Sequence, residues 1–171
     1  MVRRILITFP VVIALLALGT TIVIAKNGPL AGDLERVRGA LARYNSIENA
    51  ERDGYVAASP CESSPAGAMG IHYINPSLLA PGIDPLQPEL LLYLPNAQGK
   101  LKLIGVEYMS IDADQDLATA DDRPVIFGQP FDGPMLGHAP GMPIHYDLHV
   151  WLFEANPVGV FAAWNPAISC P

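Results

Sequence analysis

Residues 137–153 read GHAPGMPIHYDLHVWLF and contain a long strand candidate, residues 144–153. Pro143 precedes the long apolar part of this run, and the strong β-formers of residues 150–153 (VWLF) continue it. A helix is therefore disfavoured, and the helical HExxH zinc motif does not apply here. The segment therefore predicts a strand. Strand geometry then determines which of its side chains lie on the same face of the sheet.

The alternation of a strand places His145, Asp147 and His149 on one face. On a helix the two histidines would be neighbours about 6 Å apart, but on a strand they lie roughly 13 Å apart, at about 3.3 Å per residue. Because a single ion cannot take both without a bulge, the further ligands of a metal site must come from neighbouring strands. His72 and Glu107 are the candidates, since each is a metal-capable residue inside an otherwise apolar run and must find a partner when buried.

Short apolar runs separated by proline and glycine follow Cys61 and predict the rest of the sheet. They cover residues 69–75, 89–94, 101–111 and 159–164, with a short apolar piece at 125–127. The turn residues PNAQGK indicate a hairpin between the second and third of these runs. The sequence therefore predicts an α+β fold, in which N-terminal helices precede a mainly antiparallel β-sheet or partial barrel.

The helices are predicted between the N-terminus and Cys61. Asp33 is placed to cap a first helix, and apolar residues then recur at helical spacing, at Leu34, Val37, Leu41 and Tyr44. A second helical stretch covers residues 46–52, with Ser46 as its N-cap and Gly54 after its end. We expect residues 26–32 to be a flexible lead and residues 33–171 to form a single globular α+β domain.

The first 25 residues have the pattern of an export signal. Arg3 and Arg4 precede an almost wholly apolar run, which ends at Val23-Ile24-Ala25 with small or aliphatic residues at the −3 and −1 positions. This ending favours a cleaved signal peptide, and an uncleaved N-terminal anchor remains the alternative because about 20 apolar residues span a bilayer. Both interpretations place the rest of the chain outside the cytoplasm, as a secreted or periplasmic protein.

The charge of the exported part excludes two classes of partner. Removing Arg3 and Arg4 from ten basic residues leaves eight against seventeen acidic ones, a net charge of −9. Nucleic acid is excluded because phosphate binding requires clustered lysine and arginine. Adsorption to an anionic membrane is disfavoured for the same reason, so membrane contact is expected only through the N-terminal segment.

Cys61 and Cys170 are the two cysteines of the chain, and an exported protein with an even cysteine count usually forms disulfides. Closing a loop of this length would stabilise the fold by roughly 4 kcal/mol and would pin the C-terminus to the start of the strand region. A thiolate metal site or a redox pair is the alternative, but the sequence has no CxxC motif.

A second set of metal-capable residues lies in the loop before the predicted strand. His138 and Met142 are joined there by Met135, in the run MLGHAPGMPIH. Thioethers favour Cu(I), while imidazoles suit Cu(II) and zinc, so a mixed set of this kind is typical of copper handling. The alternative for the methionines is gap-filling in a core.

Residues 112–122 (DADQDLATADD) hold five aspartates, and the first three imitate the start of an EF-hand loop. The pattern then fails, because Leu117 stands at the glycine position and Arg123 at the glutamate position. We therefore interpret the segment as a solvated acidic loop, with a weak calcium site as the alternative.

Several segments together resemble an uncharacterised family of exported bacterial proteins to which no activity is attached. They are SPCESSPAGAMGIHYINP (59–76), PELLLYLP (88–95), LIGVEY (103–108), FGQPFDGPMLGHAPGMPIHYDLHVWLF (127–153) and WNPAISC (164–170). The resemblance covers most of the chain from about Tyr44, and its most specific part is GHAPGMPIHYDLHVW. It implies export and a single domain, and it assigns no functional residue.

The candidate residues described above are compatible with three functions. The first is an exported metal-binding protein with a copper or zinc ion on the sheet, for which the candidate ligands are His72, Glu107, His138, Met142, His145, Asp147 and His149. The second is a metal-dependent extracytoplasmic enzyme, an oxidoreductase or hydrolase, in which a three-histidine and one-carboxylate site keeps an open position. The third is a metal-free module that binds a small molecule through aromatic side chains, for which the candidates are Trp151, Phe153, Phe161 and Trp164.

Overall fold

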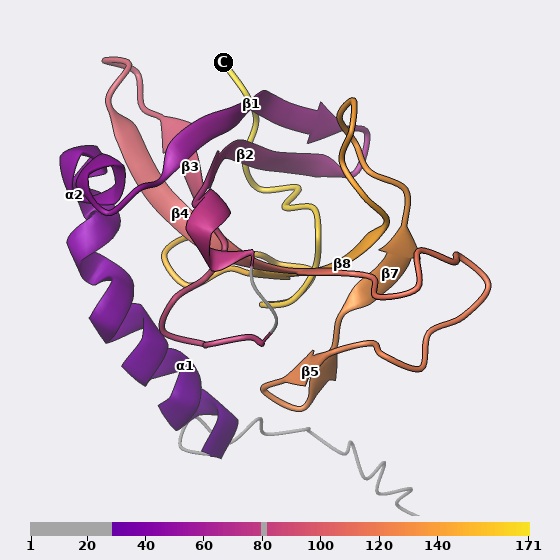
Figure 1. The fold of residues 1–171 in the computed structure, drawn as a ribbon. Coiled ribbons are helices and arrows are strands. Elements are labelled where there is room, and N and C mark those ends of the chain that lie inside the picture. The colour runs from indigo at the N-terminus through magenta and orange to yellow at the C-terminus, as the bar shows by residue number, and fades with distance from the viewer. Residues whose placement is uncertain (1–28, 80–81) are drawn as a thin grey trace, which may run out of the picture.

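Six strands form one curled antiparallel sheet in the computed structural model, which describes residues 29–79 and 82–171 (Figure 1). In the order of the sheet the strands are β1 (Val56–Ser64), β2 (Gly67–Ile74), β3 (Leu90–Pro95), β4 (Leu101–Ile111), β8 (His145–Val150) and β7 (Asp132–Met135). A small ribbon of β5 (Val125–Ile126) and β6 (Gln129–Pro130) precedes β7. The predicted α+β fold with an antiparallel partial barrel is confirmed.

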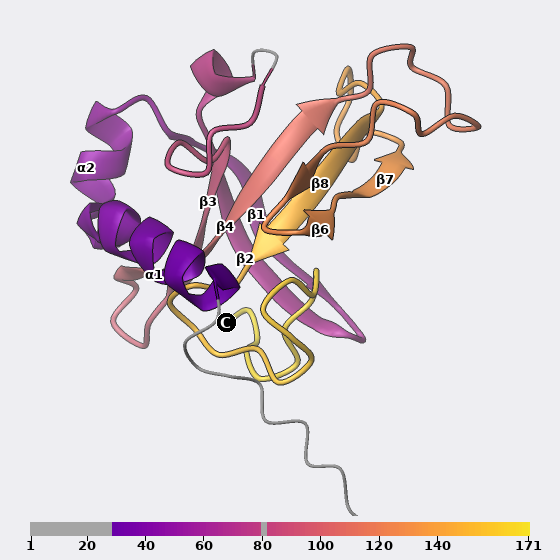
Figure 2. The same ribbon diagram turned by 90° about the horizontal axis from the view of Figure 1, so that it is seen from below.

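The N-terminal helices pack along one side of this sheet (Figure 2). They are α1 (Pro29–Leu41), the 3-10 turn η1 (Ala42–Asn45) and α2 (Ile47–Arg52), and a further 3-10 turn, η2 (Pro76–Leu78), follows β2. The predicted apolar stripe is confirmed, because Val37, Leu41 and Tyr44 are buried. No helix among the described residues is long and apolar enough to cross a membrane.

The first helix begins earlier than predicted. It starts at Pro29 rather than after Asp33, so residues 29–32 of the expected lead are helical. Proline suits the first helical position because a backbone N–H has no helical partner there. Ser46 is the N-cap residue of α2, as predicted, although its hydroxyl donates to the Glu48 carboxylate and makes no capping bond to the backbone. The predicted signal peptide, and residues 26–28 of the lead, lie outside the described residues.

The predicted strand over residues 159–164 is wrong. Strand β8 has no free edge for it, because β4 pairs with one side of β8 and β7 with the other. The segment instead touches the sheet through single backbone bonds, such as Trp151 N–H to the Val160 carbonyl at 2.9 Å. Conversely, β1 was not predicted, because its sequence VAASPCESS is polar and contains Pro60, which an edge strand tolerates.

The two faces of the central strands differ in character. Directly paired residues of an antiparallel sheet point to the same side. Val106 pairs with Val150, and both belong to the hydrophobic core that also contains Val37 of α1. The alternate positions carry Glu107 opposite His149, so the opposite face of the sheet presents polar, metal-capable side chains.

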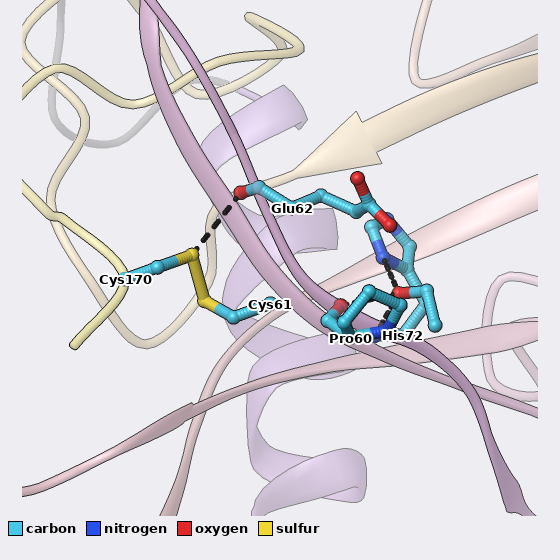
Figure 3. Close-up of a disulfide and its surroundings, with 6 residues drawn as sticks. Pro60, Cys61, Glu62, His72 and Cys170 are labelled. Atoms are coloured by element: carbon cyan, nitrogen blue, oxygen red, sulfur yellow. Dashed lines mark hydrogen bonds between the residues drawn. A yellow bond between two sulfur atoms is a disulfide. The ribbon is translucent and has the colours of Figure 1, made fainter.

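The predicted disulfide is confirmed. Cys61 on β1 is bonded to Cys170, which ties the C-terminal segment to the edge of the sheet (Figure 3). A second tie lies nearby, where Ala68 and Asn165 exchange backbone hydrogen bonds of 3.1 and 3.0 Å. A disulfide indicates an oxidising, extracytoplasmic environment.

Candidate metal centre

Three strands bring His72, Glu107 and His149 together. Glu107 on β4 and His149 on β8 are direct cross-strand partners, and the Glu107 Oε2 atom lies 3.7 Å from His149 Nε2. His72 comes from β2, and its Nε2 atom lies 3.3 Å from the same oxygen. One ligand atom from each residue lies within 4.8 Å of the other two. The predicted combination of His149 with His72 and Glu107 is therefore present in the fold.

Glu107 and His149 are buried, and three of the polar atoms of this pair have no hydrogen-bond partner in the described part of the chain. His149 is 2 % exposed and Glu107 is 5 % exposed. Glu107 Oε2 and both ring nitrogens of His149 lack a partner, so the contacts of 3.3 to 3.9 Å around them are not aligned hydrogen bonds. Each buried polar atom left in this way costs about 1–3 kcal/mol. The cluster is therefore an unfavourable arrangement unless something else occupies it.

A hydroxyl on the neighbouring strand fixes the tautomer of His72. The Ser59 hydroxyl donates to the Pro60 carbonyl at 2.7 Å and lies 3.0 Å from His72 Nδ1. Because its proton is already used, Ser59 accepts from Nδ1–H, and His72 Nε2 keeps its lone pair toward Glu107. Metal-ligating histidines are held in this way by a partner on the other nitrogen. Figure 3 shows His72 beside Pro60 on the hairpin that carries the disulfide.

Burial keeps the cluster uncharged near neutral pH. It lowers the pKa of His72 to about 4, with a smaller effect of His138 in the same direction. The pKa of His149 falls to about 3, mainly by burial and further by His72 and His138. Burial also raises the pKa of Glu107 well above its usual range, and the nearby Asp147 raises it further. Burial thus favours neutral imidazoles and an uncharged carboxyl group in the metal-free cluster.

Asp147 lies on the other side of His149. It is 5 % exposed, and its Oδ1 atom lies 3.9 Å from His149 Nδ1. Burial, with the charge of Asp132, raises the pKa of Asp147 to about 7. Its position suits an outer partner that orients the His149 ring while Nε2 faces Glu107.

The remaining predicted ligands form a separate group. His145 is buried, and its ring lies 5.2 Å from the ring of His138 rather than in the His72 cluster. Met142 lies beside His138, whose backbone N–H donates to its sulfur at 3.4 Å. The roughly 13 Å spacing expected for a strand explains why His145 and His149 fall into different groups.

Two residues around the centre were missed by sequence reasoning. Ser59 lies on β1, whose polar sequence gave no strand signal, so its contact with His72 could not be anticipated. Glu89 precedes β3, and its carboxylate accepts the backbone N–H of Met109 at 3.1 Å. Burial raises the pKa of Glu89 to about 7.

Backbone and side-chain donors meet several carboxylates of the predicted acidic loop. The Asp116 N–H donates to both Asp112 and Asp114 at 3.0 Å. Asp122 accepts from the Ala113 N–H and from the Tyr146 hydroxyl, each at 2.8 Å. The rest of the loop is exposed, as a solvated acidic loop should be, but Asp112 is buried and its Oδ1 atom has no partner among the described residues.

The aromatic side chains proposed for a metal-free pocket mostly pack in the interior. Trp151 is 5 % exposed, and Phe153 and Phe161 pack against the main core. A pocket of about 570 Å³ lies instead between the N-terminal helices and the segment after β2, and its lining includes Arg43 and Asn75. The lining contains no residue of the His72, Glu107 and His149 cluster.

Chemically, two imidazole nitrogens and one carboxylate oxygen are a ligand set that zinc and copper accept. Three protein ligands leave a further coordination position for water or for a fourth group. The chain matches no protein-family model, no curated protein and no solved structure. The function is therefore inferred from the geometry of the cluster.

Proposed function

We propose that this protein is an exported metal-binding protein, and that a copper or zinc ion is held by His72, Glu107 and His149. One observation carries the proposal: three ligand atoms from three strands lie within 4.8 Å of one another, buried and largely without hydrogen-bond partners. A cation between them would supply the missing partner for each atom. It would also remove the cost of burying these groups unpaired.

The ligand types support copper or zinc over magnesium or calcium, because imidazole suits the former and oxygen-rich sites the latter. Copper is favoured over zinc by the thioether of Met142 in the adjacent group, since soft ligands accompany copper sites. Export is supported by the N-terminal signal pattern and by the disulfide of Cys61 with Cys170.

The metal content of the purified protein tests this proposal. The protein is prepared without a histidine tag, and its bound metals are measured by elemental mass spectrometry before and after incubation with micromolar Cu²⁺ or Zn²⁺. We expect one ion per chain, which is lost in His149→Ala and in Glu107→Gln. Glu89→Gln is the matched control, because it neutralises a buried carboxylate outside the cluster and should keep the metal.

Wild-type protein that stays free of Cu²⁺ and Zn²⁺ at micromolar concentration would contradict the proposal. Equal metal content in wild type and in both cluster variants would contradict it as well, because the ion would then lie elsewhere. Circular dichroism of each variant shows whether a loss of metal reflects the ligand or the fold.

A metal-dependent enzyme, an oxidoreductase or hydrolase, is the second candidate, and the open coordination position favours it. Replacing the ion with Co²⁺ and adding azide tests for that position. A change in the visible spectrum would show an exchangeable ligand, as catalysis requires. An unchanged spectrum would contradict an open coordination position, and metal binding without catalysis would then be the supported function.

A further inference from the structure

A second group of metal-capable side chains lies at the start of β8, apart from the proposed centre. It consists of His138 and Met142, in the loop between β7 and β8, and His145, the first residue of β8. The rings of His138 and His145 lie 5.2 Å apart at 76°, edge to face. None of these three residues is a ligand of the proposed His72, Glu107 and His149 centre.

His145 has a buried nitrogen with no partner among the described residues. The residue is 1 % exposed, and its Nδ1 atom lies 3.1 Å from the Pro143 carbonyl oxygen. Since a carbonyl only accepts, Nδ1 carries the proton, and Nε2 is left as a lone pair. That Nε2 atom is buried and unpaired. A histidine held at Nδ1 by a backbone carbonyl, with Nε2 free, has the arrangement of a metal ligand.

The loop also places a thioether beside the backbone of His138. The Met142 sulfur accepts the His138 backbone N–H at 3.4 Å. The loop folds back so that Met142 lies close to the backbone of Gly137. Only glycine fits at residue 137, because a Cβ atom there would lie 2.6 Å from the Cβ of Met142. His138 is exposed, Met142 is half-buried and His145 is buried. The group is therefore accessible to solvent on the side of His138.

The two groups are close enough to influence each other electrostatically. Burial lowers the pKa of His72 and His145, and positive charge on His138 lowers both further. They share no ligand, however, since His72, Glu107 and His149 meet around one oxygen and His145 lies outside that set.

We infer that His138, Met142 and His145 form a second metal subsite, and that this subsite takes monovalent copper. Two imidazoles and one thioether are a soft, neutral ligand set, which suits a singly charged soft ion better than a divalent one. Cysteine thiolates would compete for Cu(I) in most proteins, but both cysteines of this chain are in the disulfide. Histidine and methionine are therefore the ligands left for it. The inference goes beyond the proposed function, because the subsite binds through different residues.

Competition with a chromophoric Cu(I) chelator tests the subsite. The untagged protein is titrated anaerobically with Cu(I) supplied as its acetonitrile complex, without a thiol reductant, so that the disulfide stays intact. We expect one Cu(I) per chain. His138→Ala is expected to weaken binding by more than the roughly 10–100-fold that loss of an outer partner costs, because it removes a ligand.

Met142→Leu is expected to weaken Cu(I) binding at least tenfold and to remove the sulfur scatterer from the X-ray absorption spectrum of the bound copper. Met69→Leu on β2 is the matched control, because it removes a thioether of the same kind from a different strand. His145→Ala should abolish Cu(I) binding. His138 is exposed, so its variant keeps the test valid even where replacing the buried His145 impairs folding.

Measuring both Cu(I) and the divalent ion in each variant distinguishes the two sites. His149→Ala should keep Cu(I) and lose the divalent ion, whereas His138→Ala should do the reverse. Cu(I) affinity that is unchanged in both His138→Ala and Met142→Leu would overturn the second subsite. The same result would not contradict the metal site proposed at His72, Glu107 and His149. Cu(I) binding that is lost only in His149→Ala would also overturn it, since a single centre would then bind both ions.

Discussion

Asp147 lies beside His149, one of the three proposed metal ligands. Its Oδ1 atom lies 3.9 Å from His149 Nδ1, close enough to hold the ring when His149 Nε2 binds an ion. We expect Asp147→Asn to weaken binding of the divalent ion about 10–100-fold, because outer partners of metal-ligating histidines have effects of this size. Isothermal titration of wild type and variant measures the difference. An affinity within twofold of wild type would show that Asp147 does not orient the ring.

Glu107 makes the metal affinity depend on pH. Burial raises its pKa well above the usual range, so a proton competes with a metal ion for this carboxylate. His72 and His149 have pKa values of about 4 and about 3, so both are neutral already and release nothing. The affinity should therefore rise with pH between 6 and 8, by up to about tenfold per unit, as one released proton requires.

Titrations in two buffers of different ionisation enthalpy measure this proton directly. Asp147→Asn should keep the slope while binding more weakly, which would assign the proton to Glu107. An affinity that is constant from pH 6 to pH 8 would contradict a protonated Glu107 in the metal-free site.

Several residues of the site followed from the sequence because strand alternation is a strict rule. It put Asp147 and His149 on one face, and the requirement that buried polar groups find partners selected His72 and Glu107 from apolar runs. Strand spacing also separated His145 from His149 by roughly 13 Å, but it gave no information on which strands are adjacent. Ser59 could not be found at all, since its strand carries no apolar pattern.

At the scale of elements, the turn between β1 and β2 is packed against the C-terminal segment. Gly67 has φ +131°, and a Cβ atom there would collide with the Asn165 carbonyl and lie 2.6 Å from Pro166 N. We expect Gly67→Ala to lower the free energy of unfolding by about 3 kcal/mol. About 1–2 kcal/mol of this comes from the backbone conformation and the rest from overpacking. Urea denaturation measures it.

Gly99→Ala is the control for Gly67→Ala. Gly99 also has a positive φ, +75°, but a Cβ atom there would meet nothing within 4 Å. Its replacement by alanine should lower the free energy of unfolding by only about 1 kcal/mol, from the backbone conformation alone. Equal losses in the two variants would show that the C-terminal segment is not held tightly against this turn.

The same segment explains the one strand that was predicted wrongly. Residues 159–164 (GVFAAW) are apolar enough for a strand, yet their apolar side chains are used to cover the sheet, where Val160 and Phe161 pack against the core. Hydrophobic patterning reports that a segment is buried, and it does not report whether a sheet edge is free to pair with it. At β8 neither edge is free.

At the scale of the whole molecule, the class of fold could be predicted because helical and strand periods occupy different parts of the chain. The helical stripe ends with Tyr44, and alternating or apolar runs begin after Cys61. A partial barrel was one of the two forms expected of the sheet, but its strand order could not be predicted. The order depends on long-range pairs, such as β4 with β8, which are separated by the acidic loop and by β5, β6 and β7.

The disulfide connects these distant parts, and its removal should affect the stability of the whole molecule. Cys61 and Cys170 are 109 residues apart, so the bond restricts a large loop in the unfolded chain. We expect the double variant Cys61→Ser/Cys170→Ser to lose about 4 kcal/mol of unfolding free energy, as loop-closure entropy predicts. Urea denaturation with and without dithiothreitol tests this. The reductant should destabilise wild type by a similar amount and leave the double variant unchanged, whereas equal stability of wild type and variant without reductant would show that the bond adds nothing.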